Sequence, residues 1–188
     1  AMGMDPLEFR RKNLMPVGYY HAFSQNELYS DTFNQCFDKG AEIIGYYDKV
    51  KKYAKQKGDI RRGIAASTFW YNTAVYPIAL ETSSCRIVMN QDGSVQFQLG
   101  ETEIGQGADT VAAQMIADTV GIPLSMVHPV SCQDTDITPF GTGVYASRGT
   151  YTLGFSVRQT ALLLKEKILE AAHQFTRMPV YNLDLVDG

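Results

Sequence analysis

Two short segments rich in small residues combine side chains and turns that could hold a ligand. The first is the turn Gly105-Gln106-Gly107, and the second spans residues 141–150. Each precedes a helix-like run, and the start of a helix leaves several backbone N–H groups unpaired beside a partial positive charge. Two such helix ends favour a ligand with more than one phosphate-like or acidic group. The alternative interpretation is that the glycines only allow the chain to turn.

The polar side chains of these segments have distinct hydrogen-bonding abilities. Gln106 presents a neutral amide that can both donate and accept, and its glycine neighbours let a ligand approach the backbone. This combination suits a heteroatom-rich ligand such as a pterin, a purine or a metal-oxo group. In the second segment, Ser147 and Thr150 offer hydroxyls and Arg148 offers a bidentate cation, although a surface ion pair is the simpler interpretation of Arg148.

Other motifs point less clearly to a ligand. Residues 141–146 match a relaxed Gly-x-Gly-x-x-Ala dinucleotide fingerprint, but no strand directly precedes them, so NAD or FAD binding is a minor alternative. Residues 134–136, Asp-Thr-Asp, resemble the start of a calcium loop but lack its third acidic position and its glycine, which favours an Asx-turn. The three histidines and three cysteines are too scattered to predict a metal site or a disulfide framework.

Composition restricts the class of protein more than it identifies it. The chain has 188 residues, which suits about one domain or one and a half, and its 45% hydrophobic content can form a core. A net charge of −3 gives no reason to expect nucleic acid as a partner. No apolar run approaches the roughly 20 residues that span a bilayer. Together with the scattered cysteines, these features predict a cytoplasmic protein that does not enter a membrane.

Apolar residues that recur every three or four positions predict four helices. They are expected at residues 4–14, 31–56, 107–120 and 153–175. Asp5 can cap the first helix and Pro6 suits its first position, whereas Gly45 weakens the second helix near its middle. The last helix has an apolar stripe along its whole length, and this stripe requires a sheet to cover.

Alternation of apolar and polar residues predicts a β-hairpin in the middle of the chain. Its strands are residues 85–89 and 95–99, on either side of a turn at residues 90–93. Further strands are expected at residues 64–76, 127–132 and 180–186, and a loop at residues 15–29. This order indicates an α+β fold in which helices pack on one face of a mixed sheet.

A change in sequence texture near residue 58 predicts two parts of unequal character. Residues 1–58 are expected to form a helical N-terminal segment that is the edge of an incomplete domain. Residues 59–188 are expected to form the α+β domain that carries both candidate turns.

Several motifs, in this order along nearly the whole chain, resemble the molybdenum hydroxylase family in its xanthine dehydrogenase-like branch. They are Asp5-Pro6-Leu7-Glu8-Phe9-Arg10, Arg62-Gly63-Ile64-Ala65, Asp92-Gly93-Ser94-Val95, Glu103-Ile104-Gly105-Gln106-Gly107-Ala108, Asp134-Thr135-Asp136 and Ala146-Ser147-Arg148. The resemblance implies the fold of a molybdopterin-binding domain. No single motif is decisive, but the set is specific. Residues 81–84, Glu-Thr-Ser-Ser, and residues 90–93 point to the purine-oxidising branch.

The resemblance also implies roles for particular residues. The turn formed by Gly105, Gln106 and Gly107 would lie beside the molybdenum centre, and Gln106 would hydrogen-bond near the metal and its dithiolene. The pterin would be cradled by Ala146, Ser147, Arg148, Gly149 and Thr150. Tyr76, or the equally alignable Val75, would line the substrate pocket. No residue of the chain is assigned as a metal ligand or as the general base, because the family's catalytic glutamate belongs to a motif outside these residues.

The reaction that the resemblance implies is hydroxylation of a purine, hypoxanthine or xanthine, with oxygen from water. Electrons would leave through iron–sulfur clusters and FAD on partner domains or subunits. The chain would then be a fragment that is inactive alone and that self-associates through apolar surface normally covered by the rest of its subunit. The alternatives are an aldehyde or another N-heterocycle as substrate, or a binding or assembly module that has the fold without the chemistry.

Overall fold

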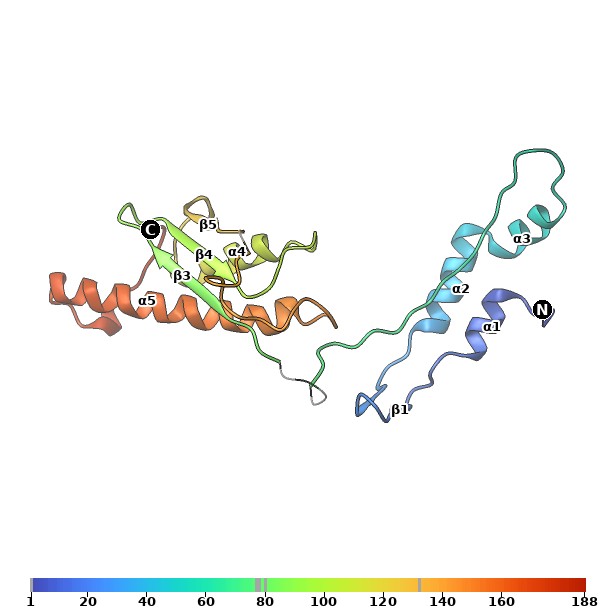
Figure 1. Ribbon diagram of the computed structural model, residues 1–188, viewed down its shortest axis with the longest axis horizontal. Coiled ribbons are helices and arrows are strands. Elements are labelled where there is room, and N and C mark those ends of the chain that lie inside the picture. The colour runs from blue at the N-terminus through green and yellow to red at the C-terminus, as the bar shows by residue number, and fades with distance from the viewer. Residues whose placement is uncertain (1, 77–78, 80, 132) are drawn as a thin grey trace. The chain divides into compact units, whose positions relative to one another are not determined.

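The computed structural model describes residues 2–76, 79, 81–131 and 133–188, which form two compact units. The first unit is Ala1–Trp70 and the second is Tyr71–Gly188 (Figure 1). Each unit has its own apolar core. The boundary lies later in the chain than residue 58, because Ile64 and Ala66 pack against the apolar cluster of the first unit.

The first unit is built from three helices around a small core. These helices are α1 (Pro6–Lys12), α2 (Phe33–Ile44) and α3 (Tyr46–Ala54). The Asp5 carboxylate caps α1 as predicted, because it accepts the backbone N–H groups of Leu7 at 2.8 Å and Glu8 at 3.3 Å. The buried cluster consists of Leu7, Phe37, Ala41 and Tyr46.

Three predictions for the first 76 residues are wrong. The single helix expected at residues 31–56 is divided into α2 and α3, because Gly45 adopts a left-handed conformation with φ 60°. The loop expected at residues 15–29 contains a short antiparallel pair, β1 (Tyr20–His21) and β2 (Asn26–Glu27). The strand expected at residues 64–76 does not form, because these residues have no strand partner within the described part of the chain.

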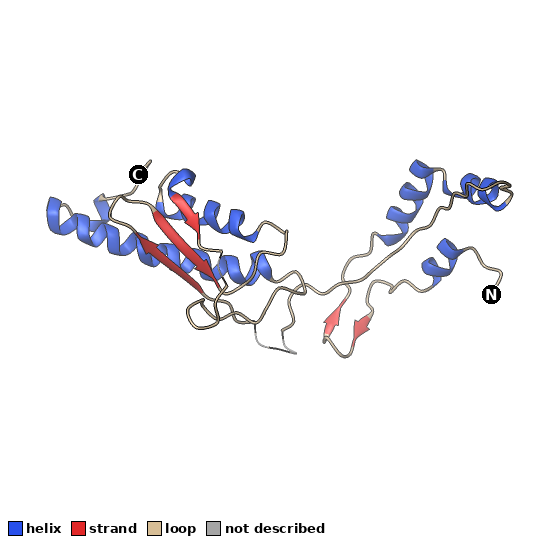
Figure 2. Cartoon of the chain, turned by 45° about the horizontal axis from the view of Figure 1, so that its top comes forward, coloured by secondary structure: helices blue, strands red, loops and turns tan. Residues whose placement is uncertain are grey.

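The second unit consists of a mixed sheet with helices on one face, which confirms the predicted fold class. The sheet contains β3 (Cys85–Met89), β4 (Val95–Leu99) and β5 (Val127–Pro129), and the main helices are α4 (Ala108–Val120) and α5 (Gly154–Thr176). The first two strands form the predicted antiparallel hairpin, with Ile87 opposite Phe97, and β5 runs parallel to β4. The two helices pack together against the sheet (Figure 2).

The core of the second unit lies between this sheet and the helices. On β4, the buried side chains of Val95 and Phe97 alternate with more exposed glutamines and face the helices. Ile116 of α4 and Val157 of α5 are completely buried against them. The apolar stripe of α5 is covered over only part of its length, and Phe175 is 89% exposed. The reason is size: five-residue strands span about 17 Å, whereas a 23-residue helix extends about 35 Å.

The C-terminal residues differ from their predicted conformation. The strand expected at residues 127–132 ends at Pro129, and Cys132 lies outside the described residues. The strand expected at residues 180–186 is wrong, since Val180–Asn182 form a 3-10 turn and the following residues join no sheet among those described. The chain end instead packs near the end of α4, where the Gly188 N–H donates to the Gly121 carbonyl at 3.0 Å.

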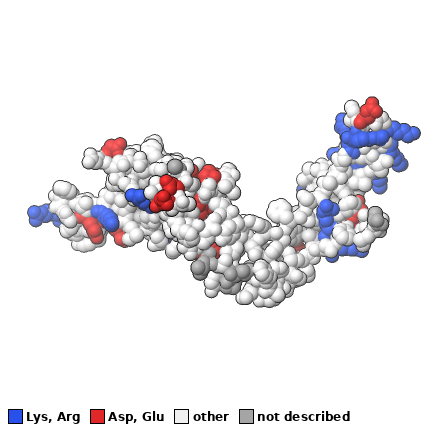
Figure 3. All heavy atoms as spheres, viewed as in Figure 1, with Lys and Arg blue, Asp and Glu red and all other residues white. Residues whose placement is uncertain are grey.

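Positive charge is concentrated on one helix of the first unit (Figure 3). Basic side chains gather over α3 in the first unit (Figure 3), where the sequence supplies Lys49, Lys51, Lys52 and Lys55. The lysines in the last turn of α3, Lys51 and Lys52, interact favourably with the negative pole of the helix dipole. None of the described helices combines the length and apolar character needed to cross a bilayer.

Candidate functional site

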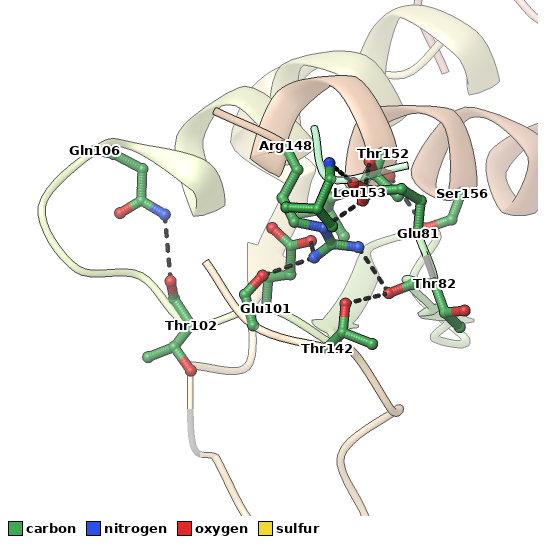
Figure 4. A network of polar contacts seen from close by, with 12 residues as sticks. Glu81, Thr82, Glu101, Thr102, Gln106, Thr142, Arg148, Thr152, Leu153 and Ser156 are labelled. Atoms are coloured by element: carbon green, nitrogen blue, oxygen red, sulfur yellow. Dashed lines mark hydrogen bonds and ion pairs between the residues drawn. The ribbon is translucent and has the colours of Figure 1, made fainter. Parts of the chain in front are cut away.

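The first candidate turn lies at the surface of the second unit, immediately before α4. Gly105 and Gly107 have φ angles of 101° and 85°, which glycine adopts without the strain of other residues. The exposed Gln106 side chain folds back on the turn (Figure 4): its Oε1 accepts the N–H of Ile104 at 2.7 Å and its Nε2 donates to the Thr102 carbonyl at 3.2 Å. The amide is therefore held in place at the surface and keeps hydrogen-bonding capacity on both atoms.

The carboxylate of Glu103 occupies the amino-terminal end of α4. Its Oε1 accepts the N–H groups of Gly107 at 2.9 Å and Gly105 at 2.7 Å, and its Oε2 accepts that of Asp109 at 3.2 Å. These backbone hydrogen bonds, that of Gly107 first, lower the pKa of Glu103. The N–H groups that the sequence suggests for an anionic ligand are thus already bound to a carboxylate of the chain.

Replacing Glu103 with glutamine should destabilise the chain at neutral pH but not in acid. A lowered folded-state pKa means that the carboxylate stabilises the fold above its ordinary titration range, and that this contribution disappears as the pH falls through the folded-state pKa. The difference in unfolding free energy between wild type and Glu103→Gln should therefore be largest near pH 7 and close from about pH 4 downward.

Urea unfolding across this pH range measures the difference. Glu170→Gln is the matched control, because Glu170 is exposed on α5 and its replacement removes the same charge without removing a helix cap. A gap for Glu103→Gln that stays constant from pH 7 to pH 3 would contradict the capping role.

The second candidate segment presents hydroxyl side chains to solvent and buries the residues beside them. Ser147 and Thr150 are exposed, whereas Ala146 and Arg148 are buried. Ala146 and Ser147 have left-handed backbone conformations, with φ angles of 47° and 50°. For residues with a Cβ this conformation costs about 1–2 kcal/mol each. A π-helical turn, Gly149–Leu153, then leads into α5, and both features are frequent at functional sites.

The guanidinium of Arg148 is completely buried and forms the centre of a polar cluster (Figure 4). Its Nε donates to Glu81 Oε2 at 2.6 Å and its Nη2 to the Thr82 carbonyl at 2.8 Å. Its Nη1 donates to the Gly143 carbonyl at 2.6 Å and to Glu101 Oε1. The interpretation of Arg148 as a surface ion-pair residue is therefore wrong. A buried guanidinium offers no surface to a ligand, so its side chain can serve a ligand only through the residues that it holds.

The two carboxylates that share Arg148 differ in their tendency to ionise. Burial raises the pKa of Glu101, and the charge of Arg148 opposes this only in part. Burial also acts to raise the pKa of Glu81, but the hydrogen bond from Arg148, the backbone N–H of Val75 and the charge of Arg148 together outweigh it and leave the pKa of Glu81 below its ordinary value. Glu101 Oε2 and Ser83 Oγ are buried without an ordinary hydrogen bond among the described residues, although Ser83 lies near enough to lower the pKa of Glu101 slightly.

Close backbone contact brings the two candidate segments to the same end of the second unit. A Cβ on Gly100 would lie 2.5 Å from the carbonyl oxygen of Phe140, and a Cβ on Gly141 would lie 2.6 Å from the carbonyl carbon of Gly100. Ala108, which begins α4, and Thr150 line one narrow crevice. The tertiary structure therefore brings together two turns that the sequence treats separately.

Tyr76 and two sequence motifs, residues 134–136 and 141–146, have surroundings that differ from one another. Tyr76, predicted to line a substrate pocket, is 75% exposed, and no described residue encloses it. Asp134 accepts the N–H of Asp136 at 2.9 Å, which confirms the Asx-turn. The dinucleotide-like residues 141–146 follow loop and not strand within the described chain, so the context that such a fingerprint requires is missing.

Sequence reasoning missed several residues that organise the site. The Tyr71 hydroxyl accepts the N–H of Ala146 at 2.6 Å, and Glu81 and Glu101 hold Arg148. A local signal existed only for Glu103, because an acidic residue just before a helix favours a capping role. For the others, no pattern near them in the sequence identifies the partner.

The second unit is a mixed sheet with helices on one face, and at one end it carries two turns whose exposed amide and hydroxyl groups are available to a polar ligand. The chain matches the family described as the molybdopterin cofactor-binding domain over residues 39–188. It therefore belongs to the molybdopterin cofactor-binding domain family.

Individual relatives agree with this assignment. The chain is 41% identical over 188 residues to the xanthine dehydrogenase molybdenum-binding subunit of Escherichia coli O157:H7, covering 100% of this chain and 25% of that protein. It is 30% identical over 188 residues to the carbon monoxide dehydrogenase large chain of Afipia carboxidovorans, covering 90% and 23%. Its fold is similar to quinoline 2-oxidoreductase from Pseudomonas putida 86, with a TM-score of 0.56, 19% identity, and coverage of 100% and 25%. The chain thus spans about a quarter of these proteins.

The residues of the two turns fit the molybdopterin cofactor. Nothing lies within 4 Å of the position that a Cβ would take at Gly105 or Gly107, so a ligand can approach this backbone closely. The Gln106 amide and the exposed hydroxyls of Ser147 and Thr150 supply donors and acceptors for polar groups of a pterin and its phosphate. The fit is to a neutral, hydrogen-bonding cradle, since the cations and helix N–H groups nearby are bound within the chain.

Proposed function

We propose that this chain is the part of a xanthine dehydrogenase-like oxidoreductase that holds the molybdenum cofactor against a purine substrate. The observation that carries the proposal is 41% identity over the whole chain to a xanthine dehydrogenase molybdenum-binding subunit. The reaction is hydroxylation of hypoxanthine or xanthine with oxygen from water. Because the general base is expected outside these residues, the 188 residues alone should turn over no purine.

In this proposal, the residues of the chain bind and orient and do not themselves react. When bound, the cofactor supplies the two-electron oxidation of a substrate C–H group. Gln106, between Gly105 and Gly107, hydrogen-bonds beside the metal centre. The pterin is held through backbone and hydroxyl groups of Ala146, Ser147, Gly149 and Thr150. The buried Arg148 side chain supports this segment from inside the fold, and Tyr76 borders the purine.

The proposal also specifies partners and surroundings. Iron–sulfur clusters and FAD on partner domains or subunits would receive the electrons, in a cytoplasmic enzyme of purine metabolism. The rest of the molybdopterin subunit would cover apolar side chains that are exposed here, such as Phe69 at 83% and Phe155 at 66%. Self-association of the chain alone through such side chains is therefore expected, and sedimentation at several concentrations would detect it.

Replacing Gln106 with alanine in the full-length parent subunit should reduce xanthine oxidation by at least about tenfold, because one hydrogen bond to the reaction centre is lost. Molybdenum is measured by mass spectrometry, pterin by fluorescence after oxidation, and turnover by uric acid formation. Gln114→Ala is the control, because Gln114 is an exposed glutamine on α4 outside the turn. Wild-type subunit without molybdenum or pterin, from cells that supply both, would contradict the proposed function and favour a non-catalytic binding or assembly module.

The identity of the substrate is tested separately from cofactor binding. Purines, aldehydes and N-heterocycles such as quinoline are compared as substrates of the loaded parent subunit. Preference for an aldehyde or a non-purine heterocycle would keep the cofactor role and replace the purine in the proposal.

A further inference from the structure

We propose that Arg148 is a positioning residue that ties the two cofactor-binding turns together and thereby sets the orientation of the Ser147 hydroxyl. This inference rests on the proposed function, because it assigns a means of orientation to the same site. Arg148 itself does not touch the ligand, since its side chain is completely buried.

The guanidinium connects three segments that are distant in the sequence. Through Glu101 it binds the strand end that leads into the first turn, and Thr102 directly after it accepts the Gln106 amide at 3.2 Å. Through Glu81 it binds the segment before β3 at 2.6 Å. Through the Gly143 carbonyl at 2.6 Å it binds its own loop. A single planar group with fixed donor directions therefore sets the spacing of both turns.

The backbone of the second segment at Gly149 lies next to the Glu101 carboxylate, which precedes the first turn. A Cβ at Gly149 would lie 3.5 Å from Glu101 Oε2, which is ordinary van der Waals contact. The same carboxylate is bonded to Arg148 through Oε1. Movement of the Arg148–Glu101 pair would therefore shift both the entry to the Gln106 turn and the backbone at Gly149.

The conformation that exposes Ser147 is strained and is held from both sides. Ala146 and Ser147 have φ angles of 47° and 50°, which other residues than glycine adopt only where the surroundings impose them. On one side, the Ala146 N–H donates to the Tyr71 hydroxyl and its carbonyl accepts the Ala74 N–H, both at 2.6 Å. On the other side Ser147 is followed by Arg148, whose guanidinium is fixed by its hydrogen bonds to Glu81, Thr82, Glu101 and Gly143. If that anchor loosens, relaxation of the backbone turns the hydroxyl away from its position.

The test compares wild type, Arg148→Lys, Ser147→Ala and the double variant in the full-length parent subunit. Lysine keeps a cation beside Glu81 and Glu101, but one ammonium group cannot reach all four acceptors. We expect Arg148→Lys to release bound pterin about tenfold faster, the factor that corresponds to one ordinary hydrogen bond. Because Arg148 acts through Ser147, the double variant should release pterin about as fast as Arg148→Lys alone.

A second readout does not require cofactor. Backbone hydrogen exchange in both turns, residues 102–107 and 142–150, should accelerate about tenfold in Arg148→Lys while the middle of α4 is unchanged. Arg158→Lys is the control, because Arg158 is exposed on α5. If Arg148→Lys does not fold, Glu101→Gln replaces it, since the amide keeps the shape and one acceptor oxygen while weakening the ion pair.

Each outcome decides one of the two proposals. Pterin release at the wild-type rate in the folded Arg148 or Glu101 variant would overturn the positioning role. So would a double variant whose increase in release rate equals the product of the increases in Arg148→Lys and Ser147→Ala. Wild-type subunit without pterin would instead overturn the proposed function. In that case the hydrogen-exchange measurement still tests the positioning role. Faster exchange in both turns of Arg148→Lys would support the role, and faster exchange in only one turn would overturn it.

Discussion

Replacing Arg148 with methionine should lower the free energy of unfolding of the chain by about 3 kcal/mol, the low end of the range for breaking a buried ion pair. Methionine fills most of the volume but leaves the carboxylates of Glu81 and Glu101 without a cation, and it leaves the carbonyls of Thr82 and Gly143 without a donor. The low end of the range applies because the Glu81 side chain is 15% exposed, so water can partly solvate its charge.

Urea unfolding followed by circular dichroism measures this loss, and the expected change is in the midpoint and not in the slope. Arg158→Met on the exposed surface of α5 should change the unfolding free energy by less than about 0.5 kcal/mol. Equal effects of the two substitutions would show that the buried cluster contributes no more than a surface arginine. A rise in pH should aggravate the Arg148→Met defect, because Glu101, whose pKa burial raises, then loses its proton without a partner.

Replacing Gly141 with alanine should destabilise the chain by about 3 kcal/mol, at the upper end of the usual effect of overpacking. The added Cβ would overlap the carbonyl oxygen of Gly100 and lie 2.6 Å from its carbonyl carbon. Both neighbours are backbone atoms, so no flexible side chain can move aside. The two segments that carry the candidate turns would have to separate, and, if the proposed cofactor role holds, bound pterin should be lost together with stability.

Gly40→Ala is the matched control for this substitution. Gly40 lies within α2, and nothing approaches within 4 Å of the position of an added Cβ. Alanine is the better helix former, so this variant should be more stable by about 0.5–1 kcal/mol. The two variants make the same chemical change with opposite signs. Gly141→Ala with wild-type stability and wild-type pterin content would refute the close contact between the segments.

These effects concern how the site is held, and they separate it from the atoms that would meet a ligand. The Gln106 amide and the Ser147 hydroxyl lie at the surface, where their loss should change ligand binding more than stability. Arg148 is buried and Gly141 packs against the backbone of Gly100, so substitution at either position should change both ligand binding and stability. Comparing stability with pterin content across the four variants therefore distinguishes contact from support.

Local structure was the part of the fold that could be predicted from the sequence. The cap at Asp5, the hairpin from Cys85 to Leu99 and the Asx-turn at Asp134 all depend on residues within a few positions of one another. The break at Gly45 was visible only as a weakness, because apolar spacing continues across it while the backbone turns left-handed. Residues 64–76 have strand composition but no partner strand, and composition alone does not supply one.

The candidate site divides in the same way. The sequence by itself determined which groups are available to a polar ligand, because glycines around an amide and neighbouring hydroxyl residues are recognised from a few adjacent positions. Only the tertiary structure decided what holds them. Arg148 binds Glu81 and Glu101, which lie 67 and 47 residues earlier, and the Glu103 carboxylate binds the helix end that the sequence suggests for an anionic ligand. A buried charge must find its partners wherever the fold brings them, and no spacing along the chain encodes that meeting.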